Sequence, residues 1–188
     1  AASDVYKRQD DMPRRLPMSG DHSVYAISKC AAEDLCWNYQ AEYDISCFAF
    51  RLPNIYCYMP ESKTLYNDGL PAKSSYRLMI HRAQQGEPLE VWGDPNKGMD
   101  LIYVKDFCQM IYKALFAGKE NSGIYNVGTG KLTSLDSLVD GIISVFSPDD
   151  SRSEKIYCPE KHDCVNYYMN VDKAQKKLGY APAFITPE

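Results

Sequence analysis

The sequence lacks the features that mark metalloproteins, nucleic-acid-binding proteins and membrane proteins. It has three histidines, and its seven cysteines form no Cys-x-x-Cys pair, so we expect no metal site and reduced, buried thiols. Lys plus Arg number 21 against 25 Asp plus Glu, without a long run of either sign, which argues against a nucleic-acid partner. No apolar stretch approaches the ~20 residues of a membrane span, and no signal peptide is recognisable. We therefore expect a cytoplasmic protein without a membrane partner.

What is present is a globular composition, with 45% hydrophobic and 24% charged residues in a chain of 188. A domain of this size buries roughly 70% of the surface of its unfolded chain. One hydrophobic core is therefore enough to hold it, without a disulfide or a metal.

The two ends of the chain have unusual sequences. Residues 1–9 show neither helical nor strand periodicity, and Asp4 to Gln9 resemble the translation of a transposon end used in preparing sequencing libraries. We therefore expect a non-native leader there, with a short native loop as the alternative. At the other end, Thr186-Pro187 is typical of a helix start. We expect the chain to be a fragment.

Hydrophobic periodicity and breaker residues predict alternating strands and helices. The expected helices are 24–43, 73–85, 106–117 (capped by Asp106), 134–146 (opened by the capping segment Thr133–Asp136) and a short one from Asp172 to Gly179. The expected strands are 45–50 (buried), 89–92, 100–104 and 123–127, with a loop over 57–72. This alternation is typical of an α/β fold with a mainly parallel sheet.

Tyr25 and Lys29 are the most informative pair of residues. A spacing of four places the phenol and the ammonium on one helix face. A phenol ordinarily holds its proton until about pH 10, so a tyrosine base needs neighbouring positive charge worth roughly 4 kcal/mol. An ammonium ~5 Å away supplies about 3 kcal/mol, and a cationic cofactor could supply the remainder. A second pair of this spacing, Tyr157 and Lys161, has Pro159 inside it and is not expected to be helical.

Several segments resemble the NAD-dependent epimerase/dehydratase family, the extended short-chain dehydrogenases, in order and approximate spacing. They are Tyr25-x-x-Ser28-Lys29-x-x-x-Glu33, Phe50-Arg51-Leu52-Pro53-Asn54-Ile55-Tyr56, Val91-Trp92-Gly93-Asp94, Asp100-Leu101-Ile102-Tyr103-Val104-Lys105-Asp106, Tyr125-Asn126-Val127-Gly128-Thr129-Gly130 and Asn170 to Tyr180. The resemblance implies the C-terminal part of a Rossmann-type doubly wound parallel sheet plus a small α/β substrate-binding subdomain. Residues 10–56 would complete the dinucleotide-binding domain, and 57–188 would mainly bind substrate.

The resemblance also implies roles for particular residues. Tyr25 would be the catalytic acid/base, and Lys29 would hold the nicotinamide ribose of NAD or NADP. Leu52 and Pro53 would flank the nicotinamide through their backbone, although packing alone explains them nearly as well.

Two further residues have both a functional and a structural interpretation. Asn54 could bond the substrate or cap the turn after its strand. Ser75, at the entry to the helix 73–85, could touch the substrate or cap that helix. Arg51 is expected to have a structural role.

By analogy with related enzymes, we expect the protein to be a homodimer.

The sequence departs from the family in its glycine loop and in its phosphate contacts. The family's Gly-rich dinucleotide loop is missing, and Gly128-Thr129-Gly130 lacks the third glycine of such a fingerprint. Nucleotide-sugar members usually carry two arginines where this chain has Met99 and the segment 160–163. Lys97, Lys161 or His162 could replace these diphosphate contacts, less selectively.

Three functions fit these observations. The first is an NAD(P)-dependent epimerase, dehydratase or reductase acting on a small molecule, a sugar or nucleotide-linked sugar, with the isolated 188-residue chain inactive. The second is a non-catalytic dinucleotide-binding regulatory protein, and the third is a reductase of a non-nucleotide carbonyl compound. The residues do not decide among these, nor between NAD and NADP.

Overall fold

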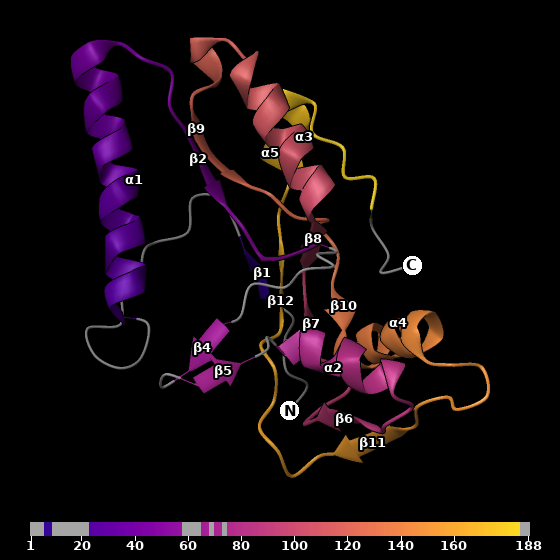
Figure 1. Cartoon of the computed structure of the whole chain (residues 1–188). Coiled ribbons are helices and arrows are strands. Elements are labelled where there is room, and N and C mark those ends of the chain that lie inside the picture. The colour runs from indigo at the N-terminus through magenta and orange to yellow at the C-terminus, as the bar shows by residue number, and fades with distance from the viewer. Residues whose placement is uncertain (1–5, 9–22, 58–64, 68–69, 73–74, 185–188) are drawn as a thin grey trace.

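A computed structural model describes residues 6–8, 23–57, 65–67, 70–72 and 75–184 (Figure 1). The helices are α1 (Ser23–Tyr43), α2 (Ser75–Gln84), α3 (Val104–Leu115), α4 (Leu135–Phe146) and α5 (Asp172–Leu178), with a 3-10 turn over Lys119–Asn121. The strands are β1 (Tyr6–Arg8), β2 (Phe48–Arg51), β3 (Asn54–Tyr56), β4 (Leu65–Asn67), β5 (Leu70–Ala72), β6 (Leu89–Trp92), β7 (Gly98–Met99), β8 (Leu101–Tyr103), β9 (Gly123–Asn126), β10 (Thr133–Ser134), β11 (Lys155–Cys158) and β12 (Tyr167–Met169).

The described strands form several small sheets, in which parallel pairs predominate. One sheet has the order β1-β12-β7-β10, and the other pairs are β11-β6, β2-β9, β3-β8 and β4-β5. Only β10-β7 and β4-β5 are antiparallel. The expected α/β class with parallel strands is confirmed, although no single wide sheet forms among these residues.

Two hydrophobic clusters hold the described part of the chain together. The first includes Ile102, Met110, Tyr125 and Val127 and lies among β8, β9, α3 and α5. The second lies where α2 and α4 cover β6 (Figure 1), and its buried side chains are Ala83, Leu89, Val91, Val139, Ile142 and Ile143. Helix α1 belongs to neither cluster.

Helix α1 stands to one side of the fold and leads into β2 (Figure 1). Its spacing of apolar residues predicts a helix correctly, yet Ile27, Leu35 and Tyr39 are all exposed. Strand β2, expected to be buried, is only half-buried, because among the described strands it pairs with β9 alone. Both elements therefore present apolar surface that the rest of the described chain does not cover.

Three other expectations need correction. The segment 57–72, expected as a loop, contains the antiparallel pair β4-β5, and the Asp68-Gly69 dipeptide between these strands is itself a hairpin signal. Residues 6–8 form β1, because parallel main-chain pairing with β12 does not require side-chain periodicity. Of the seven cysteines, expected to be buried, only Cys158 is buried; Cys36 and Cys108 are exposed, and the other four are partly exposed.

Asp106 is not a helix cap. Helix α3 begins at Val104, two residues before it, and has Tyr103 as its N-cap without a side-chain hydrogen bond. The buried Asp106 carboxylate instead accepts hydrogen bonds from the backbone N–H groups of Ala183 and Phe184, at 2.9 and 3.0 Å. It ties the segment after α5 to α3.

Other helix ends follow their sequence signals. Ser134 caps α4 by accepting from the N–H of Ser137. Gly179 ends α5 in the left-handed conformation, at φ 61°.

Candidate active site

Tyr25 and Lys29 lie one turn apart near the start of α1. The Lys29 ammonium is 5.4 Å from the centre of the Tyr25 ring, and both side chains are exposed. Ser28 donates a hydrogen bond of 2.8 Å to the Tyr25 carbonyl oxygen. The phenol and the ammonium are therefore neighbours on one helix face, as expected.

The Leu52–Asn54 turn joins the ends of β2 and β3. Pro53 is buried, whereas Leu52 is 36% exposed. Asn54 begins β3 opposite Leu101 and donates a hydrogen bond of 2.8 Å to the Met99 sulfur. This contact gives the Asn54 side chain a structural role. A role of Asn54 in substrate binding stays a prediction.

Glu33 and Arg51 form an ion pair between α1 and β2. The Arg51 guanidinium donates from NH2 to Glu33 Oε1 at 3.1 Å and from Nε to Oε2 at 3.4 Å. Both side chains are largely enclosed, with 13% of Glu33 and 26% of Arg51 exposed. Arg51 was expected to be structural, and its partner in this role is Glu33, which the sequence alone did not identify.

Ser75 is the first residue of α2 and is exposed. Figure 1 shows α2 beside α4, away from α1. The structure does not bring Ser75 together with Tyr25 and Lys29. Its role toward a substrate stays a prediction.

The Gly128–Gly130 turn binds a carboxylate of the chain itself. Buried Asp100 accepts hydrogen bonds from the N–H groups of Thr129 and Gly130, from the Thr129 hydroxyl and from the N–H of Met169, at 2.6 to 3.2 Å. A Cβ on Gly128 would lie 2.5 Å from Asp100 Oδ2, so only glycine allows this approach. These N–H groups are engaged by Asp100, which agrees with the sequence analysis that gave this turn no dinucleotide role.

The buried position of Asp100 also shifts the pKa of its carboxyl group. Desolvation raises the pKa of the carboxyl group, although its four hydrogen bonds act in the opposite direction. Asp100 lies in one of the segments that resemble the family, but only the structure shows that its carboxylate joins residues 129–130 and 169.

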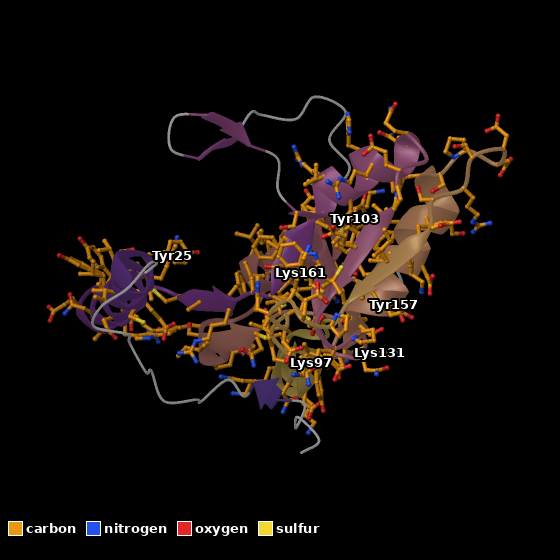
Figure 2. All side chains as sticks on the ribbon, turned by 90° about the horizontal axis from the view of Figure 1, so that it is seen from below. Tyr25, Lys97, Tyr103, Lys131, Tyr157 and Lys161 are labelled. Carbon is orange, nitrogen blue, oxygen red and sulfur yellow. The ribbon has the colours of Figure 1, made fainter. Side chains whose placement is uncertain are left out.

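Two of the candidate phosphate-binding lysines are paired with acids. Lys97 forms an ion pair with Asp163, which lowers the pKa of that carboxyl group. Lys161 lies 2.5 Å from Glu90 and over the Trp92 ring at 4.4 Å. Figure 2 shows Lys97 and Lys161 in the central part of the molecule and Tyr25 apart from them on α1.

The described residues contain neither a metal-binding cluster nor a membrane span. They have no group of three or more His, Cys, Asp or Glu side chains placed to hold a metal ion. Within the same part of the chain, every helix is too short or too polar to cross a membrane.

The comparison with protein families gives a match over most of the chain. The model of the NAD dependent epimerase/dehydratase family matches residues 2–128, which include Tyr25, Lys29 and the Leu52–Asn54 turn. The chain belongs to this family. The match covers most of the sequence segments on which the resemblance rested, from Tyr25-x-x-Ser28-Lys29 to the segment that begins at Tyr125.

Several curated relatives carry the names of nucleotide-sugar epimerases or dehydratases, at low identity. The dTDP-glucose 4,6-dehydratase of Xanthomonas campestris is 26% identical over 174 residues, which cover 87% of this chain and 46% of that protein. The Agl12 low-salt glycan biosynthesis protein of Haloferax volcanii is 28% identical over 161 residues, or 84% of this chain and 47% of its own. The chain spans about half the length of the curated relatives it matches.

Solved structures share the fold. UDP-glucuronic acid 4-epimerase from Bacillus cereus, in complex with NAD, matches with a TM-score of 0.66 at 17% identity over 97% of this chain and 53% of that one. UDP-glucose 4-epimerase from Thermotoga maritima, with UDP-glucose, matches with a TM-score of 0.63 at 23% identity over 85% and 48%. The first of these two structures holds NAD and the second holds UDP-glucose.

Proposed function

We propose that the whole protein is an NAD(P)-dependent epimerase, dehydratase or reductase that acts on a sugar, most simply a nucleotide-linked one. The observation that carries this proposal is the Tyr25–Lys29 pair on one face of α1, with 5.4 Å between the ammonium and the ring centre. Family membership and the nucleotide-sugar relatives support the substrate class.

In this proposal Tyr25 moves the proton of a substrate hydroxyl. Its phenol oxygen takes the proton as the substrate is oxidised and returns it when the substrate is reduced again. Lys29 stabilises the phenolate by its positive charge and would bind the cofactor ribose. NAD, when bound, accepts the hydride that leaves the sugar carbon.

The residues present fit the nicotinamide end of the cofactor. Tyr25 and Lys29 are exposed on α1, and the Leu52–Pro53 backbone turn lies at the end of β2. By contrast, the Gly128–Gly130 turn is engaged by Asp100 and would not hold a pyrophosphate. These residues would therefore hold the reactive end and leave the pyrophosphate to other parts of the whole protein.

The test is turnover of defined sugars by the whole protein. We expect NAD-dependent conversion of UDP-glucose, UDP-glucuronic acid or dTDP-glucose, followed by chromatography of the nucleotide sugars. Absence of conversion of all three and of free sugars would overturn the proposal.

A second candidate is a reductase of a non-nucleotide carbonyl compound. It is favoured by the engagement of Lys97 with Asp163 and of Lys161 with Glu90, because a diphosphate would have to compete with these carboxylates. Met99, which accepts from Asn54, offers no charge to a phosphate. Oxidation of NADPH by simple ketones and aldehydes, with no reaction of nucleotide sugars, would select this candidate.

A further inference from the structure

We infer that the Glu33–Arg51 ion pair positions the catalytic face of α1 against the Leu52–Asn54 turn. The inference rests on the proposed function, because it concerns the placement of Tyr25 and Lys29. Neither residue of the pair needs to touch the substrate.

The pair has the geometry of a fixed link. Two donor atoms of Arg51 meet the two oxygens of Glu33, and such fork-like contacts set orientation as well as distance. With 13% and 26% of the two side chains exposed, water competes little for these bonds. A half-buried bidentate pair holds its partners more firmly than a surface ion pair.

Glu33 lies on the face of α1 that carries the proposed catalytic residues. Tyr25, Lys29 and Glu33 follow one another at intervals of four and form one stripe along the helix. Glu33 is ~12 Å along the axis from Tyr25, at 1.5 Å per residue. Rotation of the helix about its axis would therefore move all three side chains together.

Arg51 fixes the other side of the link. It is the last residue of β2, and its carbonyl oxygen accepts a hydrogen bond of 3.0 Å from the N–H of Val127. Leu52 follows at once. The ion pair thus connects the catalytic stripe to the residue immediately before the turn that is expected to flank the nicotinamide.

The side chains of α1 pack only in part against the rest of the described structure. Tyr25, Ile27 and Leu35 are 40% to 64% exposed. Two other contacts of the helix region lie toward its C-terminal end: Cys47 Sγ donates to the Cys36 carbonyl oxygen, and Lys119 pairs with Asp44. Of these three links, Glu33–Arg51 is the nearest to Tyr25.

The experiment compares Glu33→Gln with Lys119→Gln in the whole protein, with the substrate found by the turnover assay. Glu33→Gln breaks the proposed positioning link, whereas Lys119→Gln breaks the ion pair at the far end of the helix. We expect Glu33→Gln to lower kcat by roughly tenfold or more with the KM of the sugar little changed, because small misplacements of reacting groups cost on the order of 10²-fold. Lys119→Gln should keep kcat within about twofold.

Two further measurements separate positioning from general stabilisation. Hydrogen exchange of the amides over 25–33 should be faster in Glu33→Gln than in Lys119→Gln. The exchanged variant Glu33→Arg with Arg51→Glu should recover a large part of kcat. If Glu33→Gln fails to fold, Arg51→Lys, which keeps the charge but loses the fork, should show the same selective loss of kcat.

The outcomes that overturn the inference are distinct from those that overturn the function. A lower melting temperature with unchanged kcat in Glu33→Gln would show that the pair only stabilises the fold. A kcat that stays low in the exchanged variant would show that the ion pair itself does not position α1. If Tyr25→Phe abolishes turnover while Glu33→Gln does not, only the positioning inference fails. If Tyr25→Phe retains turnover, the proposed function itself fails.

Discussion

Asp100 is a fully buried carboxylate whose four hydrogen bonds come from three residues distant in sequence from it. Burial of a charge costs free energy unless hydrogen bonds replace those to water. Here the N–H groups of Thr129, Gly130 and Met169 and one hydroxyl make that replacement. Such a residue belongs to the stability of the fold, even though it lies inside a family motif.

Asp100→Asn should destabilise the protein by about 3 kcal/mol, because an amide nitrogen would face N–H groups that need acceptors. Urea unfolding followed by circular dichroism measures this loss. The exposed Asp149→Asn serves as a control and should change the midpoint little. A wild-type midpoint for Asp100→Asn would contradict the assigned role.

Tyr25→Phe should abolish turnover in the whole protein and leave cofactor affinity nearly unchanged, because only the oxygen that carries the proton is removed. Lys29→Met should weaken both turnover and binding, since the ammonium serves both. Steady-state kinetics and titration of NAD measure the two effects. Wild-type turnover by Tyr25→Phe would show that another group is the base.

The clearest link between two elements joins α4 to β11. Lys155 reaches Asp136 at 2.7 Å and Asp140 at 2.9 Å, and the Tyr157 hydroxyl donates to Asp136 at 2.8 Å. These bonds, that from Lys155 above all, lower the pKa of Asp136. They also place Tyr157 in a surface network on a strand, as expected for a Tyr-x-x-x-Lys pair interrupted by Pro159.

Because the pKa of Asp136 is lower in the folded than in the unfolded chain, its contribution to stability is complete above about pH 4 and disappears as the pH falls through the lowered value. Asp136→Asn should therefore lower the urea midpoint at pH 6, and its difference from wild type should shrink below about pH 4. The exposed Asp150→Asn is the control. An equal difference at both pH values would contradict the ionic nature of the link.

Elements set by local signals were predictable from the sequence, and those set by distant contacts were not. The helix over 24–43, the strand 89–92, the Ser134 cap and the Gly179 end match the structure closely, because periodicity and capping are local. The role of Asp106 and the strand at 6–8 depend on residues 183–184 and 167–169, which no local pattern reveals.

The site shows the same division. The spacing of Tyr25 and Lys29 predicts their proximity on one helix face, and the structure has it. The pairing of Glu33 with Arg51 joins residues 18 apart across a helix and a strand, so the sequence gives their identities but not their contact.

At the scale of the whole molecule, the chain presents much apolar surface. Val24, Tyr43, Leu115 and Phe116 are 67% to 81% exposed, and β2 has one described neighbour. Exposed strand edges and apolar patches favour association between chains. We expect the isolated 188-residue chain to be marginally stable and prone to aggregation.

The same chain should not bind NAD with micromolar affinity. Dinucleotide pyrophosphate is normally held by N–H groups of a glycine loop at a helix N-terminus, and the described Gly128–Gly130 turn has these groups engaged by Asp100. Calorimetric titration of the purified chain with NAD and with NADP measures this. Micromolar binding of either would reveal a site that the residues considered above do not provide.

The hydrogen bonding of Asp100 has a consequence for the order of folding. Its partners lie 29, 30 and 69 residues further along the chain, so its carboxylate gains its last hydrogen-bond donor only after three separate segments have met. Contacts of such long range form slowly, because the entropy of closing the loops precedes any gain. We therefore expect the closing of β12 onto β7 to be a late folding step, with stopped-flow kinetics of Asp100→Asn showing faster unfolding and little change in the early folding phase.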